Sequence, residues 1–175
     1  MNVESSLTFE EVNALLCHKN GTLYWRVDRT CRTKSGNIAG GLCNGYWSLS
    51  IKGKRFRAHR VVWLLEYGEW PKQNLDHINC DKLDNRPENL RLCNQSQNTA
   101  NSLPKGSRKN GATAKGVRWE KRRGKFQARI MYNGKDKHLG YFGTEAEAAS
   151  AYNTAAIAIF GEFARLNSEQ IGGTA

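Results

Sequence analysis

The chain has 175 residues, 39% of them hydrophobic and 10% aromatic, which excludes a disordered chain and suits one domain or two small ones. The formal net charge is +11, and residues 104–138 alone carry 12 Lys and Arg against 2 Asp and Glu. This density of positive charge predicts attraction to a polyanion, most simply a nucleic acid. A membrane partner is not expected, because the sequence has neither a long apolar span nor a basic amphipathic helix.

The cysteines and the N-terminus indicate the compartment. The five cysteines are odd in number and no two form a C-x-x-C pair, so neither a disulfide framework nor a structural zinc site is expected. The first residues, "MNVESSLTFEEVNALL", lack the basic region and the long apolar region of a signal peptide. We therefore expect a reduced, intracellular protein located in the cytoplasm of a host cell.

Four elements are predicted in the first 70 residues. Thr8 and Glu11 form a capping box, which predicts a short helix from Phe9 to about Leu16. "GTLYWRV" is typical of a strand, and "CRTKSGNIAGGLCNG" of a loop. "YWSLSIKGKRFRAHR" predicts a hairpin that turns at Lys52–Gly53, and "HRVVWLLEYG" a core helix that ends at Gly68.

The stretch "LDHINCDKLDNRPENL" is polar and rich in turn residues. It predicts a short strand that ends with Asp76 and His77, a polar loop, and a second short strand in "ENLRL". Asn94 then suits the N-cap of a short helix that carries Asn98. The order strand, loop, strand, helix follows.

The last 70 residues predict a separate unit. "LPKGSRKNGATAKG" has no periodicity and indicates a basic linker, residues 104–114. Three strands follow, with turns at "RRGK" and at Asn133–Gly134. Thr144 and Glu147 form a capping box before an Ala-rich helix that Gly161 ends. We expect a three-stranded sheet with this helix across one face.

The residues around "DH" permit hydrolytic chemistry. Asp76 can bind a hard divalent cation through oxygen, and His77 can act as a general base near neutral pH. Asn98 can bring a second oxygen to the same cation. Asn89 can hydrogen-bond the loop and hold His77 in place. A lone Asp-His pair is more often part of a turn or a solvated face, so the interpretation depends on the whole set.

The spacing D-H-x(7)-N-R-x-x-N-L, with an Asn nine residues after Asn89, resembles the HNH nuclease motif in its His-Asn-Asn form. The resemblance covers about residues 20–102 and includes "GTLYW" and "GYWSLSIKGKRFRAHRVVWLLEYGEWP". It implies a ββα-metal fold in which His77 activates a water, Asn89 orients His77, and Asp76 and Asn98 bind one divalent metal. Two oxygen ligands favour Mg²⁺ or Mn²⁺. His59, Arg60 and Arg91 are candidate phosphate contacts, with a structural hydrogen bond for His59 and solvation for the arginines as the alternatives.

The C-terminal segment, about residues 115–167, resembles an AP2/ERF DNA-binding domain. The matching residues are Gly116-Val117-Arg118, Gly124-Lys125-Phe126, Leu139-Gly140, Phe142, Ala148-Ala149, Ala151-Tyr152, Ala155-Ala156, Gly161 and Asn167. The resemblance implies a sheet that contacts DNA through Lys115, Arg118, Lys121, Arg122 and Arg129. His138 stands where the plant members have Trp, and Arg129 replaces an acidic residue, so their sequence preference is not inherited. A solvated basic sheet face is the alternative.

The fold class expected is α+β: a small ββα-metal nuclease domain, then a three-stranded antiparallel sheet packed on one helix. The boundaries are 1–103 for the nuclease domain (motif about 75–102), 104–114 for the linker and 115–168 for the AP2/ERF-like domain. The main hypothesis is a metal-dependent HNH endonuclease that nicks or cleaves double-stranded DNA, encoded by a phage or a homing element, and acting as a monomer or weak dimer. The alternatives are a non-catalytic DNA-binding regulator with a decayed nuclease domain, and an RNA-binding protein or ribonuclease.

Overall fold

The computed structural model describes residues 7–103 and 113–167, which form parts of two compact units. The N-terminal unit is Met1–Cys93 and the C-terminal unit is Asn94–Ala175. The division falls ahead of the predicted linker at 104–114, most of which lies outside the described residues. The short helix with Asn98 therefore packs with the C-terminal unit, and the domain boundaries drawn from the sequence stay a prediction.

The N-terminal unit opens with helix α1, Phe9–Leu15, and the predicted capping box is formed. The Thr8 amide donates to the Glu11 carboxylate at 3.0 Å, and the Glu11 amide donates to the Thr8 hydroxyl at 3.3 Å. Strand β1, Leu16–Lys19, follows at once and pairs antiparallel with β2, Thr22–Trp25. β2 was predicted and β1 was not.

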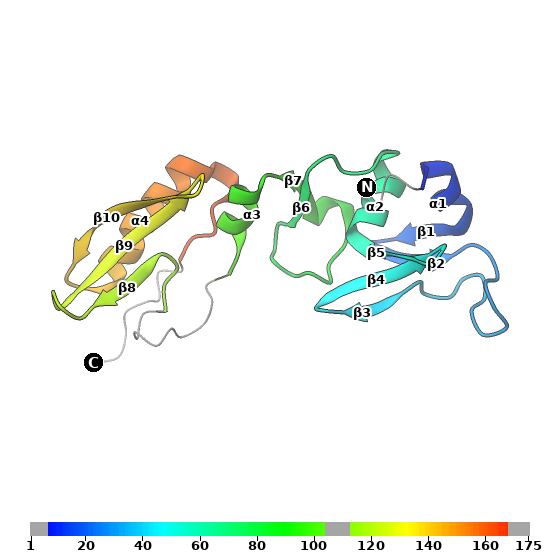
Figure 1. The fold of residues 1–175 in the computed structure, drawn as a ribbon, viewed down its shortest axis with the longest axis horizontal. Coiled ribbons are helices and arrows are strands. Elements are labelled where there is room, and N and C mark those ends of the chain that lie inside the picture. Colours follow the sequence, from blue (N-terminus) through cyan, green and yellow to red (C-terminus); the bar gives the residue numbers. More distant parts are fainter. Residues whose placement is uncertain (1–6, 104–112, 168–175) are drawn as a thin grey trace. The chain divides into compact units, whose positions relative to one another are not determined.

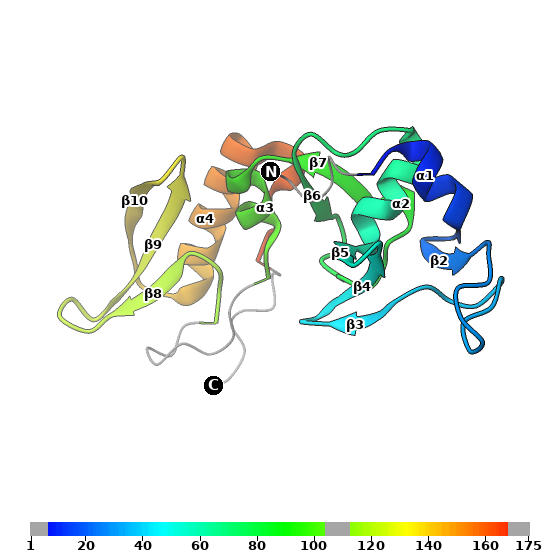
Figure 2. The same ribbon diagram turned by 45° about the vertical axis from the view of Figure 1, so that its right-hand side comes forward.

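A second sheet has the order β3-β4-β5, and helix α2 follows it (Figure 2). The strands are β3, Gly41–Cys43, β4, Tyr46–Ile51, and β5, Lys54–Arg57, and the hairpin turns at Lys52–Gly53 as predicted. β3 lies in the segment expected to be loop. α2, Ala58–Tyr67, ends at Gly68 in the left-handed conformation, and its buried side chains complete a core with those of the sheet. The buried members include Leu16, Leu23, Leu49, Ile51, Phe56, Val61, Val62 and Leu64.

The N-terminal unit ends with the motif segment. β6, Asn74–His77, pairs antiparallel with β7, Leu90–Cys93, so that Asp76 lies opposite Arg91 and His77 opposite Leu90. The polar loop between them closes with a 3₁₀ turn, η2, Pro87–Asn89. These two short strands are the ones predicted.

The C-terminal unit begins with α3, Gln95–Asn101, capped by Asn94 and Gln97. The sheet has the order β10-β9-β8, with β8 at Val117–Glu120, β9 at Lys125–Tyr132 and β10 at Lys135–Phe142. Helix α4, Glu145–Phe160, covers one face of this sheet, and η3, Gly161–Phe163, follows (Figure 1). The predicted three-stranded sheet with one helix is therefore confirmed.

Alternation along the strands gives the C-terminal sheet two different faces. Small and apolar side chains such as Val117 and Ala128 are buried beneath Ala148 and Ala149 of α4, which lets the helix approach closely. The opposite face, called the open face below, carries polar and aromatic side chains that are paired across the strands. Its members are Arg118, Gln127, Arg129, His138 and Tyr141.

Candidate active site

His77 is the last residue of β6 and is 6% exposed. Its Nε2 lies 3.1 Å from Oδ1 of Asn85, a residue that is also buried. Because a carboxamide oxygen can only accept a hydrogen bond, this contact holds the proton of a neutral ring on Nε2. In that tautomer the lone pair of the neutral ring is on Nδ1.

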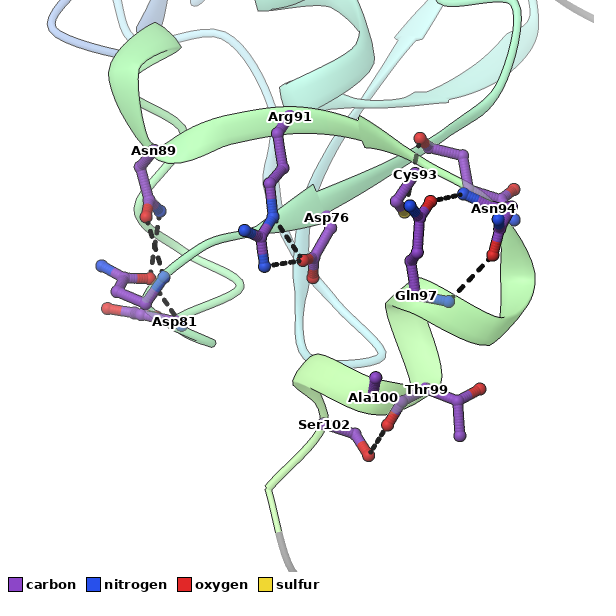
Figure 3. A network of polar contacts seen from close by, with 12 residues as sticks. Asp76, Asp81, Asn89, Arg91, Cys93, Asn94, Gln97, Thr99, Ala100 and Ser102 are labelled. Carbon is purple, nitrogen blue, oxygen red and sulfur yellow. Dashed lines mark hydrogen bonds and ion pairs between the residues drawn. The ribbon is translucent and has the colours of Figure 1, made fainter. Parts of the chain in front are cut away.

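The loop that carries Asn85 is braced by Asn89. The Asn89 carboxamide accepts from the Asn79 amide at 3.0 Å, and donates to the Asn79 side chain at 3.0 Å and to the Asp84 carbonyl at 2.7 Å. Figure 3 shows Asn89 hydrogen-bonded within this loop, close to Asp81. Asn89 thus shapes the loop, whereas the side chain that meets the His77 ring through a hydrogen bond is Asn85, for which the sequence suggested no role.

Gly21 explains why that loop sits where it does. A Cβ at this position would lie 2.4 Å from the backbone of Asn85 and of Arg86, so only glycine permits the β1–β2 turn to approach so closely. Gly21 also has φ +78°, which favours glycine. The β1–β2 turn therefore packs against the backbone of Asn85, although the two segments are far apart in sequence.

Asp76 lies beside His77 and forms an ion pair with Arg91 across the two strands. Nε and Nη2 of Arg91 donate to Oδ2 of Asp76 at 3.1 and 3.0 Å (Figure 3). The Asp76 side chain is 7% exposed and the Arg91 side chain 13% exposed. The same neighbourhood raises the pKa of the Cys93 thiol to about 11, through burial first and the Asp76 charge second. Cys93 is therefore a thiol at neutral pH and not a thiolate ligand.

The side chains that the sequence suggested as phosphate contacts interact with other residues of the protein. Arg91 pairs with Asp76, and Arg60 donates to the carbonyls of Pro71 and Gln73 at 2.9 and 3.2 Å, which fixes the segment that leads into β6. His59 is 4% exposed, and its ring meets the His77 ring edge-on with 5.0 Å between centroids. Burial, followed by the charges of neighbouring groups, lowers the pKa of His59 to about 3, so it is neutral and carries no charge toward a phosphate.

Cations that the sequence did not single out lie beside the histidines. The Tyr46 ring is 5.7 Å from His59 and 6.4 Å from His77 between centroids. Arg57 Cζ lies 4.1 Å and Lys82 Nζ 4.9 Å from the centre of the Tyr46 ring. A basic and aromatic patch next to a buried His-Asp pair suits a phosphodiester substrate. The alternation of side chains along β4 could have predicted that Tyr46 lies on the other face of the strand from the buried Leu49. No local sequence motif, however, marks Tyr46 as a site residue.

Asp76 and Asn98 each carry an oxygen of the kind that hard divalent cations prefer. Within residues 7–103 and 113–167, no three His, Cys, Asp or Glu side chains gather into a metal cage. Asp76 offers a carboxylate, and Asn98, half-buried on α3, offers a carboxamide oxygen. Mg²⁺ is commonly held by one or two protein oxygens together with water and substrate phosphate, so this donor set suits it.

The predicted DNA contacts of the C-terminal unit differ from one another. On the open face, Arg118 Nε donates to Gln127 Oε1 at 2.6 Å, the Gln127 amide lies 2.9 Å from His138 Nδ1, and Arg129 pairs with Asp136 at 2.8 Å. Lys121 and Arg122 are exposed in the β8–β9 turn. Lys115 is turned instead toward the end of α3.

Comparison with known proteins bears on the N-terminal unit and α3. A family model described as HNH endonuclease matches residues 56–100, the segment from the end of β5 through the motif into α3. An uncharacterised HNH endonuclease of Acanthamoeba polyphaga mimivirus is 33% identical over 115 residues, which are 65% of this chain and 58% of the relative. The chain thus spans a little over half the length of the curated relative it matches. No solved structure matches it significantly.

Neither match is described in terms of an AP2/ERF domain, and the HNH match ends ahead of the C-terminal sheet. Among the described residues, no helix is both long and apolar enough to cross a membrane. The family match coincides with the residues around His77 whose geometry is given above. Residues 56–100 are therefore similar to HNH endonucleases, in agreement with the resemblance noted in the sequence.

Proposed function

We propose that this protein is a metal-dependent endonuclease that hydrolyses phosphodiester bonds of double-stranded DNA. The observation that carries the proposal is the buried His77, tautomerically fixed by Asn85, beside Asp76 within the HNH match. A phage or homing element is the proposed source, and the similarity to a viral HNH endonuclease supports an origin of that kind.

The residues divide the chemistry as follows. His77 accepts a proton from the attacking water, and Asn85, at Nε2 of the ring, keeps the ring in its orientation. Asn89 holds the loop, and thereby Asn85, in place. A divalent ion held by oxygens of Asp76 and Asn98 would stabilise the negative charge that develops on the phosphate. The products expected are a 5′-phosphate and a 3′-hydroxyl.

The C-terminal unit is proposed to target the DNA. Its strands and turns hold most of the basic excess, and the resemblance to AP2/ERF domains supports contact through the open face and the β8–β9 turn. The residues proposed to contact DNA are Arg118, Lys121, Arg122 and Arg129. Arg123, whose guanidinium lies 4.6 Å from the centre of the Tyr141 ring, joins this group.

An Arg118→Ala variant is expected to bind DNA more weakly and with a shallower salt dependence. A variant with one phosphate contact fewer releases about one counterion fewer on binding. The magnitude of the slope of log affinity against log salt should therefore fall by about 1. Mobility-shift titrations at several salt concentrations measure this slope. Lys54→Ala, an exposed lysine of the N-terminal unit, is the control for a lost charge. An unchanged slope in Arg118→Ala would remove Arg118 from the contact surface.

Supercoiled plasmid carrying DNA from the source genome tests the proposed function. With Mg²⁺ the protein is expected to produce open circles, because one active site per chain cuts one strand, and EDTA is expected to prevent them. Linear product would indicate paired action by a weak dimer. Tight complexes without any cleavage would favour the non-catalytic regulator. The structural feature that supports this alternative is the ion pair of Asp76 with Arg91, which occupies the carboxylate proposed to bind the metal. Preferential cutting of RNA would favour a ribonuclease.

A further inference from the structure

We propose that Lys115 is a positioning residue that holds α3 in its helical form and so fixes the side chain of Asn98. This inference rests on the proposed role of Asn98 as an oxygen ligand of the metal. It departs from the expectation that Lys115 contacts DNA, and it makes the C-terminal unit a support for the nuclease motif as well as a means of targeting.

The ammonium group of Lys115 caps the C-terminal end of α3. Nζ donates to the carbonyl of Thr99 at 3.1 Å, to that of Ser102 at 2.7 Å, and to that of Ala100. An ammonium group has three donors, and the last carbonyls of a helix lack partners within the helix. The positive charge also lies at the negative end of the helix dipole. Lys115 therefore adds hydrogen bonds and a positive charge to this helix end, where the Thr99 carbonyl also accepts from the Ser102 amide at 3.2 Å and the Ser102 hydroxyl at 2.7 Å.

α3 depends on such support because it is short. It has 7 residues, and isolated helices shorter than about 12 residues are marginal in water. Its sequence, "QSQNTAN", contains Ser, Thr and Asn, which favour caps and turns over helix interiors. Its N-terminal end is satisfied by the Asn94–Gln97 capping box, so Lys115 supplies the corresponding support at the other end.

The backbone of Lys115 is itself clamped. Its amide donates to Oδ1 of Asn167 at 2.6 Å, and its carbonyl accepts from Nδ2 of the same side chain at 3.1 Å. Asn167 is 7% exposed. The backbone amide of Asn167 donates to Oδ1 of Asn153 on α4 at 2.8 Å, and the backbone carbonyl of Asn167 accepts from Nδ2 of Asn153 at 3.0 Å. A continuous chain of hydrogen bonds thus leads from α4 through Asn167 and Lys115 to the end of α3.

Gly116 fixes the position from which the Lys115 side chain departs. It has φ +74°, and a Cβ there would lie 2.1 Å from the Tyr152 ring and 2.7 Å from the Arg129 carbonyl. Further contacts of α3 are made within the C-terminal unit: Ala100 packs in the cluster of Ile130, Tyr152, Ala156 and Phe160, and its carbonyl accepts from the Arg165 amide at 3.2 Å. The order of α3 therefore depends on the folded C-terminal unit.

Lys115→Met in the full-length chain tests the proposal, because it keeps the length of the side chain and removes all three donors. Amide hydrogen exchange over residues 95–102, measured without metal, is expected to become about tenfold faster than in the wild type. The Mg²⁺ concentration that gives half-maximal plasmid nicking is expected to rise about tenfold, the usual effect of losing a group that orients a metal ligand. DNA affinity in EDTA should not change.

Two further variants sharpen the result. Lys137→Met removes an exposed lysine of the same unit and should leave both exchange and the Mg²⁺ midpoint unchanged. Asn167→Ala releases the backbone of Lys115 while keeping its ammonium group, and should shift both quantities in the same direction as Lys115→Met. It serves in place of Lys115→Met if that variant does not fold.

The outcomes separate the inference from the proposed function. A wild-type chain that does not nick DNA would overturn the function by itself. Unchanged exchange over residues 95–102 in Lys115→Met would overturn the role of Lys115, whatever the cleavage result. A lower rate at every Mg²⁺ concentration with an unchanged midpoint would mean a general loss of folded protein. A loss of DNA affinity in EDTA would return Lys115 to the DNA contacts.

Discussion

A His77→Ala variant is expected to lose about 10²- to 10⁴-fold in DNA cleavage rate, the range found when a general base is removed. Single-turnover nicking of supercoiled plasmid at saturating protein measures the loss. DNA affinity should stay near the wild-type value, because His77 is 6% exposed and its ring contacts include Asn85, His59 and Tyr46 of the same unit. Tryptophan fluorescence checks the fold, since four of the five tryptophans lie in the N-terminal unit.

Free imidazole distinguishes proton transfer from a structural role of His77. In the alanine variant a small base can enter the space left by the ring and accept the proton, so added imidazole should restore part of the rate. His18→Ala is the matched control, because it removes another imidazole of the same unit, one that lies 3.1 Å from Glu66. A loss of DNA binding equal to the loss of cleavage in His77→Ala would identify His77 as a structural residue.

Local patterns predicted most of the elements because the interactions that define them span only a few residues. The capping boxes predicted at Thr8 and Thr144 each join residues three positions apart, and both are formed, as is the N-cap predicted at Asn94. The turn at Asn133–Gly134 has φ +48° and +73°, which the sequence Asn-Gly favours. β1 and β3 were missed because their four and three residues gain strand structure from their partners and not from their own composition.

The site was predictable only where its parts are close in sequence. Asp76 and His77 are neighbours on one strand, and the spacing to Asn89 identifies the loop. The contact between His77 and Asn85 could not be predicted, because the loop takes its shape from Gly21 in another hairpin. The direction of Lys115 was missed for a similar reason. The resemblance to AP2/ERF domains implied a DNA contact, but the carbonyls that its ammonium group meets lie at the end of a helix formed by earlier residues.

Acid is expected to destabilise the N-terminal unit through His59. Burial, the neighbouring His77 and the charges of Arg57 and Arg60 lower the pKa of His59 to about 3 in the folded state, against the ordinary 6.5. Below pH 6.5 the unfolded state takes up a proton that the folded state does not, so stability is full above this value and falls as the pH falls toward 3. The free energy of unfolding should therefore drop by about 2 kcal/mol between pH 7 and pH 5 from this residue alone.

Urea unfolding followed by tryptophan fluorescence at both pH values measures that drop, and His59→Phe isolates the share of His59. Phenylalanine keeps an aromatic ring beside Tyr46 and His77 but cannot titrate, and it removes the buried Nδ1 that has no hydrogen-bond partner among the described residues. The variant should lose about 2 kcal/mol less than the wild type over the same interval, because only the wild type gains a proton at this position on unfolding. Equal losses in the two proteins would mean that His59 is protonated in the fold, and would place a positive charge next to the proposed general base.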